Sequence, residues 1–362
     1  MARLRIFTLI WLFLAVAIYQ YKHPDSSTID ERANNPVPQN WMKNTGVPTV
    51  SSKDIRPADQ TFLTFPEWFL VFSPDEQADY FKATTSTSFP YMGHVSQLWK
   101  GYKIVYSQIK DNYQFNTGYH VMIWVIAVST TVEYGLKSVY ETMVGGFTDT
   151  GQPLTSEDQF NANYMRSYVD FIETTPWYLF DFMDQLHGLW YETSAGGGHW
   201  LRKLERRYYL TTELLVKASY GYLIKLGTQS AYEEALLNTT VVLDTPFDKG
   251  HYPDGVSFLG IQNAIVMSFP RYAPFKTAAS VAAQQDLNFN EIAGNNSAVL
   301  LTVISSKKPK TDPRHTKVLF SQSFLTRPGL SRFALVTTVP QLSKTLKVLR
   351  GSSVEVEHIY DY

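Results

Sequence analysis

The chain begins with an apolar segment that is flanked by basic residues. An uncharged run from Ile6 to Tyr21 lies between Arg5 and Lys22. Its sixteen residues fall just short of the roughly 17–25 that cross a bilayer as a helix, but both flanking side chains can extend their charges to the interfaces. Since basic residues precede the run, the pattern predicts a membrane helix over residues 1–21 whose N-terminus stays in the cytoplasm.

A cleavable signal peptide is the alternative for the same segment. Ala15-Val-Ala17 is a small-x-small site of the kind at which signal peptides are cut. We favour an uncleaved anchor, because Tyr19, Gln20 and Tyr21 continue the run as an interfacial helix end would. Both interpretations place the rest of the chain outside the cytoplasm, and the favoured anchor predicts that the protein is located at the cell (inner) membrane.

A polar stretch and then a helical pattern follow the apolar segment. Residues 22–60 are rich in turn formers and lack an apolar period, which predicts a linker. Ser73-Pro-Asp-Glu76 predicts a helix with Ser73 as its N-cap, and Ser156-Glu-Asp-Gln159 predicts a second helix with Ser156 as the cap of a capping box. A long helix is predicted from about His199 to Leu226. We therefore expect a mainly helical, aromatic-rich domain over residues 61–237.

The longest uncharged run covers residues 112–132 and contains His120. Its strongly apolar part is nearer fifteen residues, a length typical of a buried helix, so we favour a buried helix over a second membrane span. A second span would return the C-terminal domain to the cytoplasm. The helix is predicted to continue through Glu133, Lys137 and Glu141, whose i, i+4, i+8 spacing lets them pair along one face.

After about Asn238 the segments become short, β-branched and alternating, which is typical of strands. Strands are predicted near 239–244, 259–268, 298–305, 317–325, 332–339 and 353–360, with helices at 273–285 and 340–350. Their order approximates strand–helix–strand–strand–helix–strand, the ferredoxin-like pattern, although extra strands are left over. The predicted class is therefore α+β, with a ferredoxin-like α/β sandwich over residues 238–362. No internal repeat is visible in the sequence.

Composition narrows the function classes. Net charge is −1, and a nucleic-acid partner is not expected because phosphate binding needs a basic excess. The chain has no cysteine, which excludes disulfides, thiolate metal sites and cysteine nucleophiles. Aromatic residues make up 15% of the chain, and Tyr and Trp suit places where one end of a side chain is apolar and the other wet.

No diagnostic catalytic motif is present, so the site candidates rest on residue type alone. His-Glu-x-x-His is absent, and the one Glu-x-x-His, ending at His358, falls in a predicted strand where its two residues point to opposite faces. A metal needs at least three converging ligands, and several predicted helices could bring some together. The candidates are His120, Glu133, His187, Glu192, His199, Glu205 and Glu213. Because the usual spacing is missing, ordinary polar or capping roles are the favoured alternative.

One glycine-rich segment carries a further hypothesis. Gly196-Gly-Gly198 precedes the long predicted helix, and Arg202, Lys203, Arg206 and Arg207 follow it. A phosphate cradle at the helix N-terminus is one interpretation, but no preceding strand or phosphate-loop motif supports it. A hinge followed by a solvated basic helix face, or by a patch that meets acidic lipid, is favoured.

Two function classes remain open. The first is a membrane-anchored, non-catalytic component of an envelope complex or a binder of a hydrophobic ligand, with the lipid bilayer and other envelope proteins as partners. The second is an enzyme that uses His120, Glu133, His187, His199 and Glu213, with or without a metal, in the helical domain. The anchor, the aromatic excess and the lack of a catalytic signature favour the first.

Overall fold

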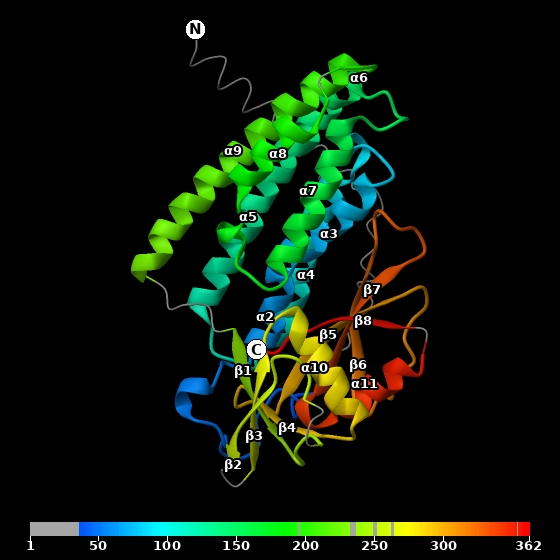
Figure 1. The fold of residues 1–362 in the computed structure, drawn as a ribbon. Coiled ribbons are helices and arrows are strands. Elements are labelled where there is room, and N and C mark those ends of the chain that lie inside the picture. Colours follow the sequence, from blue (N-terminus) through cyan, green and yellow to red (C-terminus); the bar gives the residue numbers. More distant parts are fainter. Residues whose placement is uncertain (1–35, 195, 232–236, 249–251, 262–263, 353) are drawn as a thin grey trace. The chain divides into compact units, whose positions relative to one another are not determined.

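The computed structural model describes residues 36–194, 196–231, 237–248, 252–261, 264–352 and 354–362. These residues form two compact units (Figure 1). A helical unit contains the described residues of 69–96 and 126–235, and a sheet unit contains those of 36–68, 97–125 and 236–362. Both units combine segments that are distant in sequence, so this division differs from the predicted boundary at residue 238.

The predicted membrane helix over residues 1–21 lies outside the described residues. Within the described part of the chain, no helix is long and apolar enough to cross a membrane. This includes α5 (Thr117–Tyr140), which contains most of the uncharged run 112–132, so the second span is not supported there. The favoured interpretation, a buried helix, holds only for part of α5, because several of its apolar side chains are exposed.

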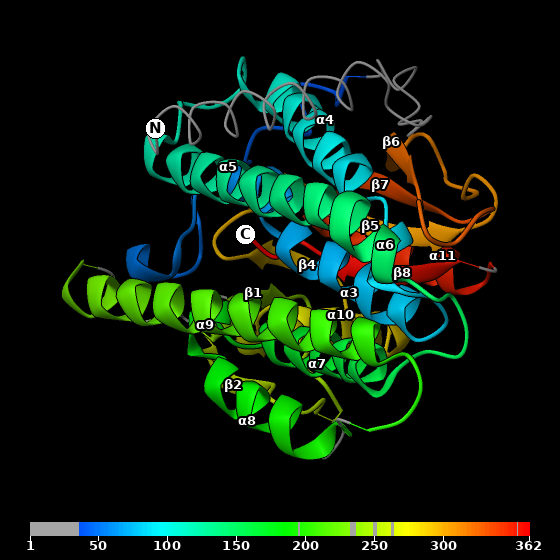
Figure 2. The same cartoon turned by 90° about the horizontal axis from the view of Figure 1, so that it is seen from above.

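The helical unit consists of helices joined by short turns. Helix α3 packs against α7, and α8 packs along the much longer α9 (Figure 2). A π-helical turn, Glu141–Gly145, continues the end of α5 into α6. The helices are α3 (Phe69–Phe81), α4 (Tyr91–Ile109, to Ser96 in this unit), α5 (from Ile126 in this unit), α6 (Gly146–Thr148), α7 (Ser156–Ile172), α8 (Phe182–Glu192) and α9 (Trp200–Ala231).

Two predicted helix starts are displaced in the structure. Helix α3 already begins at Phe69, so Ser73 lies inside it and is not its N-cap. The capping box of α7 uses Thr155 as N-cap and Asp158 as its partner, one residue before the predicted Ser156. Thr155 Oγ1 accepts from the Asp158 amide, and the Asp158 carboxylate accepts from the Thr155 amide. The long helix predicted from His199 is confirmed by α9.

The sheet unit contains two antiparallel sheets of four strands each. One has the order β2-β3-β1-β4 and the other the order β6-β7-β5-β8. Its strands and helices are α2 (Gln60–Glu67), α4 from Gln97, α5 up to Val125, β1 (Asn238–Leu243), β2 (Ser257–Ile261), β3 (Ile265–Pro270), α10 (Ala273–Gln284), β4 (Phe289–Ile292), β5 (Ala298–Ser305), β6 (Thr316–Ser323), β7 (Ser331–Thr338), α11 (Leu342–Arg350) and β8 (Glu355–Ile359).

Both sheets follow the same chain path. In each, three strands are followed by a helix and a fourth strand, and the spatial order is second, third, first, fourth. The predicted α+β class is confirmed, but the strands form two sheets and not the single sheet of a ferredoxin-like sandwich. The prediction missed β4 and read the hairpin of β2 and β3 as one strand, because both are short and close together.

One apolar core joins the two sheets. It includes Val241 and Phe289 from the first sheet, Leu335 and Ile359 from the second, and Phe275 from α10, all at 0% exposure. These side chains therefore belong to a single buried cluster that includes residues of both sheets.

Residues 36–59, which belong to the predicted linker, are part of the sheet unit and form hydrogen bonds with its C-terminal segment. The amide of Thr49 donates to Glu291 Oε2 at 2.9 Å, and Asn44 Nδ2 donates to Asn295 Oδ1 at 2.9 Å.

Candidate functional site in the helical unit

Four charged side chains form a closed ring between α5 and α9. Each helix supplies a glutamate and, four residues later, a lysine: Glu133 and Lys137 from α5, and Glu213 and Lys217 from α9. Lys137 Nζ lies 3.0 Å from Glu133 Oε1 and 3.0 Å from Glu213 Oε1. Lys217 Nζ lies 3.1 Å from Glu213 Oε1 and 3.4 Å from Glu133 Oε1, the same two oxygens. The charges therefore alternate around this charge ring.

The charge ring holds its four groups in their ionised forms. Burial raises the pKa of Glu213, but the ammonium groups of Lys137 and Lys217 outweigh it and lower that pKa to about 2. Glu133 is affected in the same way, and its pKa is also lowered. Burial lowers the pKa of each lysine, and the carboxylates outweigh it so that each pKa rises well above its usual value. The ring therefore has no group that exchanges a proton near neutral pH.

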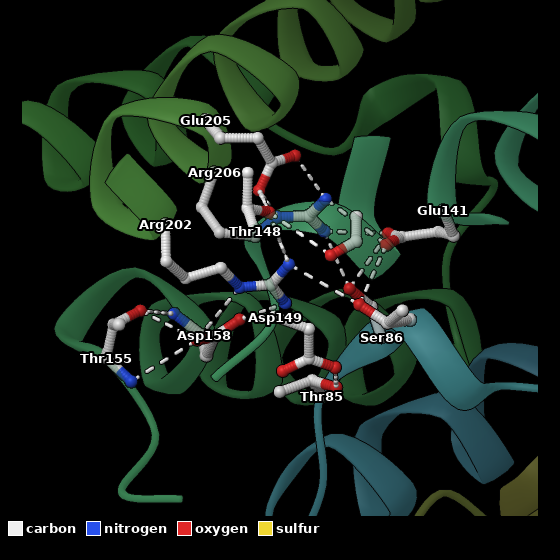
Figure 3. A network of polar contacts seen from close by, with 12 residues as sticks. Thr85, Ser86, Glu141, Thr148, Asp149, Thr155, Asp158, Arg202, Glu205 and Arg206 are labelled. Carbon is white, nitrogen blue, oxygen red and sulfur yellow. Dashed lines mark hydrogen bonds and ion pairs between the residues drawn. The ribbon is translucent and has the colours of Figure 1, made fainter. Parts of the chain in front are cut away.

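A second polar network, built around two arginines, lies further along the same two helices (Figure 3). Arg206 of α9 is fully buried and lies 2.7 Å from Glu141 Oε1, and it also pairs with Glu205. Arg202 is 1% exposed and lies 2.7 Å from Asp158 Oδ1. Thr148 Oγ1 donates to Glu205 Oε2 at 3.1 Å. The predicted solvated basic face is therefore wrong for these two arginines, because acidic residues from other helices neutralise them inside the unit.

The two networks form one polar seam between antiparallel helices. Along α5 and its continuation the order is 133, 137, 141, 148, and the partners on α9 run backwards as 217, 213, 206, 202. Buried charges are costly unless they are paired, and within this seam nearly every charge has an opposite neighbour.

The faces of α5 and α9 that point away from this polar seam are apolar. On α9, Leu204, Tyr208, Leu215 and Tyr222 are exposed at intervals of four or seven residues, which places them on one side of the helix. On α5, Val128, Val132 and Leu136 follow at intervals of four. A water-exposed helix normally has the opposite arrangement, with its charges outside. These helices are thus inverted: their ion pairs face inwards and their apolar side chains face outwards.

A small cavity of about 40 Å³ lies beside the charge ring. Glu133, Lys137 and Lys217 line it, together with Gln77 and Tyr134. Gln77 Nε2 donates to the Tyr134 hydroxyl at 2.6 Å, while Gln77 Oε1 is buried with no hydrogen-bond partner among the described residues. A space of this size admits only molecules close to water in size.

A serine–histidine pair extends from the Tyr134 side of the cavity. Ser73 Oγ lies 2.7 Å from the Tyr134 hydroxyl and 3.0 Å from His94 Nδ1, and Glu76 Oε2 lies 3.7 Å from His94 Nε2. The residue types match a nucleophile, base and orienting acid. All three residues are only 1% exposed, so a substrate carbonyl has no access to the serine oxygen. The arrangement therefore serves as an internal hydrogen-bond chain.

Among the described residues of the helical unit, the structure brings together two of the predicted site residues, Glu133 and Glu213, which share both lysines of the charge ring. His120 belongs to the sheet unit, where it is 2% exposed, contacts the Tyr102 hydroxyl at 2.9 Å and stacks on Phe115. His187 and His199 are both exposed. No group of three His, Asp or Glu side chains in the described part of the chain has a metal-binding arrangement.

The lysines of the charge ring were not among the predicted candidates. The signal for them was the Glu-x-x-x-Lys spacing, which occurs at 133–137 and again at 213–217.

The sheet unit contains a cluster of ionisable groups that sequence reasoning missed. Tyr119 donates a short hydrogen bond to Glu67, and Arg271 Nε lies 3.3 Å from Asp361 Oδ2. Burial raises the pKa of Glu67 and of Asp361, although Tyr119 and Arg271 partly oppose it. Tyr272 beside them has φ +62°, an unusual conformation for a residue with a side chain. The hydrogen-bonding and charged groups of this cluster are paired mainly with one another.

In comparisons with known proteins, no family profile, curated protein or solved structure matches the chain.

Proposed function

We propose that this protein is a membrane-anchored, non-catalytic component of an envelope complex, and that the outer face of α9 with the end of α8 binds a protein partner. The observation that carries the proposal is the inversion of α9, whose charges pair inside the unit while its outer side chains are apolar and exposed. A large exposed apolar surface is unfavourable in water and commonly marks an interaction site.

The side chains of this face are of the kind that protein interfaces use. Tyrosine and tryptophan are enriched in such interfaces because they combine a large apolar surface with a polar tip. The exposed residues of this α8/α9 face include Trp190, Tyr191, Trp200, Leu204, Tyr208 and Tyr222. Trp190 is held in place by a hydrogen bond from its Nε1 to Thr211 Oγ1 at 3.1 Å, which lowers the entropy lost when a partner binds.

The proposed location at a membrane rests on the prediction made from the N-terminal segment. The uncharged run from Ile6 to Tyr21, preceded by two arginines, supports an anchor with the body outside the cytoplasm. An anchor of this kind would concentrate the α8/α9 face near other membrane proteins, where even modest contact affinity suffices for assembly.

The alternatives have less support. A hydrophobic-ligand binder needs a cavity of roughly 300–1,000 Å³, and the one beside the charge ring is about 40 Å³. An enzyme with a His/carboxylate site would need the histidines near Glu133 and Glu213, but lysines neutralise both carboxylates, and neither His187 nor His199 is buried with them.

Extraction of the full chain from its own host in mild detergent, followed by native mass spectrometry, tests the proposal. Two variants, Leu204→Glu and Tyr208→Glu, place a charge on the exposed face without touching the polar seam. We expect the wild type to carry a protein partner and each variant to lose it, with at least about tenfold weaker association, while the unfolding midpoint is unchanged.

The matched control is Asn163→Glu, which adds the same charge at an exposed polar position of α7. This variant should retain the partner. A wild-type chain that is extracted only as a lone monomer would contradict the proposal, as would a partner that all three variants retain.

A further inference from the structure

The outer face of α5 differs in chemistry from that of α9. Val128, Val132, Leu136, Met143 and Phe147 are 51–80% exposed, and they follow one another along one side of α5, the π-helical turn and α6. The span from the first to the last is about 29 Å. Apart from one phenylalanine the side chains are aliphatic or thioether, and none of the five has a hydrogen-bonding group.

The charges of this segment all lie away from that face. Lys137 and Glu141 are buried, and they pair with Glu213 and Arg206 of α9. Glu133 is partly exposed at the edge of the face, but its carboxylate is paired with both lysines of the charge ring. The outer face therefore presents about 29 Å of surface without an ionised group.

The hydroxyl groups near this face are satisfied by the helix itself. Ser129 Oγ donates to the Ile126 carbonyl at 3.0 Å, and Thr142 Oγ1 donates to the Ser138 carbonyl at 2.7 Å. Thr131 Oγ1 likewise donates to the Ala127 carbonyl, four residues earlier, at 2.6 Å. In lipid, every polar group needs a partner within the protein, because hydrocarbon offers none. This face meets that requirement, whereas a protein partner would more often be met by side chains with polar tips.

We infer that the outer face of α5 lies on the lipid of the bilayer. The inference rests on the proposed membrane anchor, which would hold the protein at a lipid surface. Since no described helix can cross a membrane, α5 would lie along the surface, with its apolar side chains about 5–10 Å deep at the boundary of headgroups and acyl chains. The charge ring faces away from the lipid.

The absence of cysteine makes a direct test simple. Val128→Cys, Val132→Cys and Leu136→Cys are each labelled with a nitroxide in the full-length protein, which is reconstituted into vesicles of phosphatidylcholine and phosphatidylglycerol. Asn163→Cys on α7 is the matched control, because this polar residue is exposed in the same unit. Electron paramagnetic resonance then compares collisions of each label with oxygen, which enters lipid, and with a water-soluble nickel chelate.

For the three α5 labels we expect oxygen collisions to exceed nickel collisions several-fold relative to the Asn163 label. Labels that meet the nickel chelate as the control does would overturn the inference, and so would labels shielded from both agents, which would indicate a protein cover. Flotation of the same samples tests separately whether the protein binds the vesicles. Protein that floats but has water-exposed α5 labels would support the anchor and contradict the lipid contact of α5. Protein that does not float would contradict both.

Discussion

At the scale of single residues, Arg206 determines the stability of the polar seam. Its guanidinium is fully buried between Glu141 and Glu205. Without it, too little positive charge would remain nearby to neutralise these two carboxylates. We expect Arg206→Met to lower the free energy of unfolding by about 3–5 kcal/mol, because breaking a buried ion pair from one side leaves an uncompensated charge. Chemical denaturation followed by circular dichroism measures the loss.

Arg314→Met is the control for that prediction. Arg314 pairs with Asp312 at 2.8 Å, but its side chain is 81% exposed, so water can replace the lost contact. This variant should unfold with the wild type. Equal losses in both variants would mean that the burial of Arg206 is unimportant.

His358 should make stability depend on pH. Burial lowers the pKa of His358 to about 3, and its ring stacks on Trp68 at 3.9 Å. The unfolded chain binds a proton near pH 6.5 while the folded one does not, so stability falls as the pH drops below about 6.5. From pH 7 to pH 5 this group alone should remove about 2 kcal/mol.

The variant His358→Gln checks that slope. Its own stability at pH 7 can differ from the wild type, but the decline between pH 7 and pH 5 should become shallower, because the residue no longer titrates. The exposed His187 provides the control, and His187→Gln should keep the wild-type slope. An unchanged slope in His358→Gln would show that other groups cause the pH dependence.

At the scale of elements, two neighbouring residues at the start of α7 have different roles. Thr155 caps the helix, whereas the Ser156 hydroxyl only contacts the Glu157 side chain at 2.9 Å. We expect Thr155→Ala to cost about 1 kcal/mol or more, since a helix amide loses its acceptor, and Ser156→Ala to cost clearly less. Thermal unfolding of both variants decides between the capping position seen here and the one that the sequence predicts.

The inverted arrangement of α5 and α9 shows why periodicity alone did not predict the direction in which the charged face of α5 points. The spacing of Glu133, Lys137 and Glu141 correctly predicted that they share one face, because that follows from 3.6 residues per turn. It did not predict that this face points inwards. That depends on Glu213, Lys217 and Arg206 of α9, which lie far away in sequence and neutralise these charges.

At the scale of the molecule, the sheet unit should unfold as a single cooperative structure. Phe289 in β4 and Leu335 in β7 belong to different sheets but to one core. Phe289→Ala and Leu335→Ala should cost about 3–5 and 2–5 kcal/mol respectively, because each leaves a cavity. Hydrogen exchange should show lost protection in both sheets for either variant.

Phe258→Ala is the control, because Phe258 in β2 is half exposed and contributes less to that core. Little change in exchange is expected for it. If Phe289→Ala left the β6-β7-β5-β8 sheet fully protected, the two sheets would be separate folding units and the shared core would not couple them.

Features of this protein that depend on near neighbours along the chain can be read from the amino-acid sequence alone. Alternating and 3.6-residue patterns located most strands and helices, and composition identified the uncharged N-terminal run and the absence of cysteine chemistry. Local patterns fix backbone conformation because each residue responds first to residues a few positions away.

Contacts between residues that are distant in sequence became visible in the folded structure. It arranged the C-terminal strands as two sheets with a common chain path, because strand pairing is set by contacts between distant segments. It buried Arg202 and Arg206, for which the sequence favoured a solvated face, and it assigned His120 to the sheet unit but Glu133 and Glu213 to the helical unit. Burial and ion pairing are properties of the assembled helices, so the polar seam and the apolar outer faces of α5 and α9 appear only once those helices are packed.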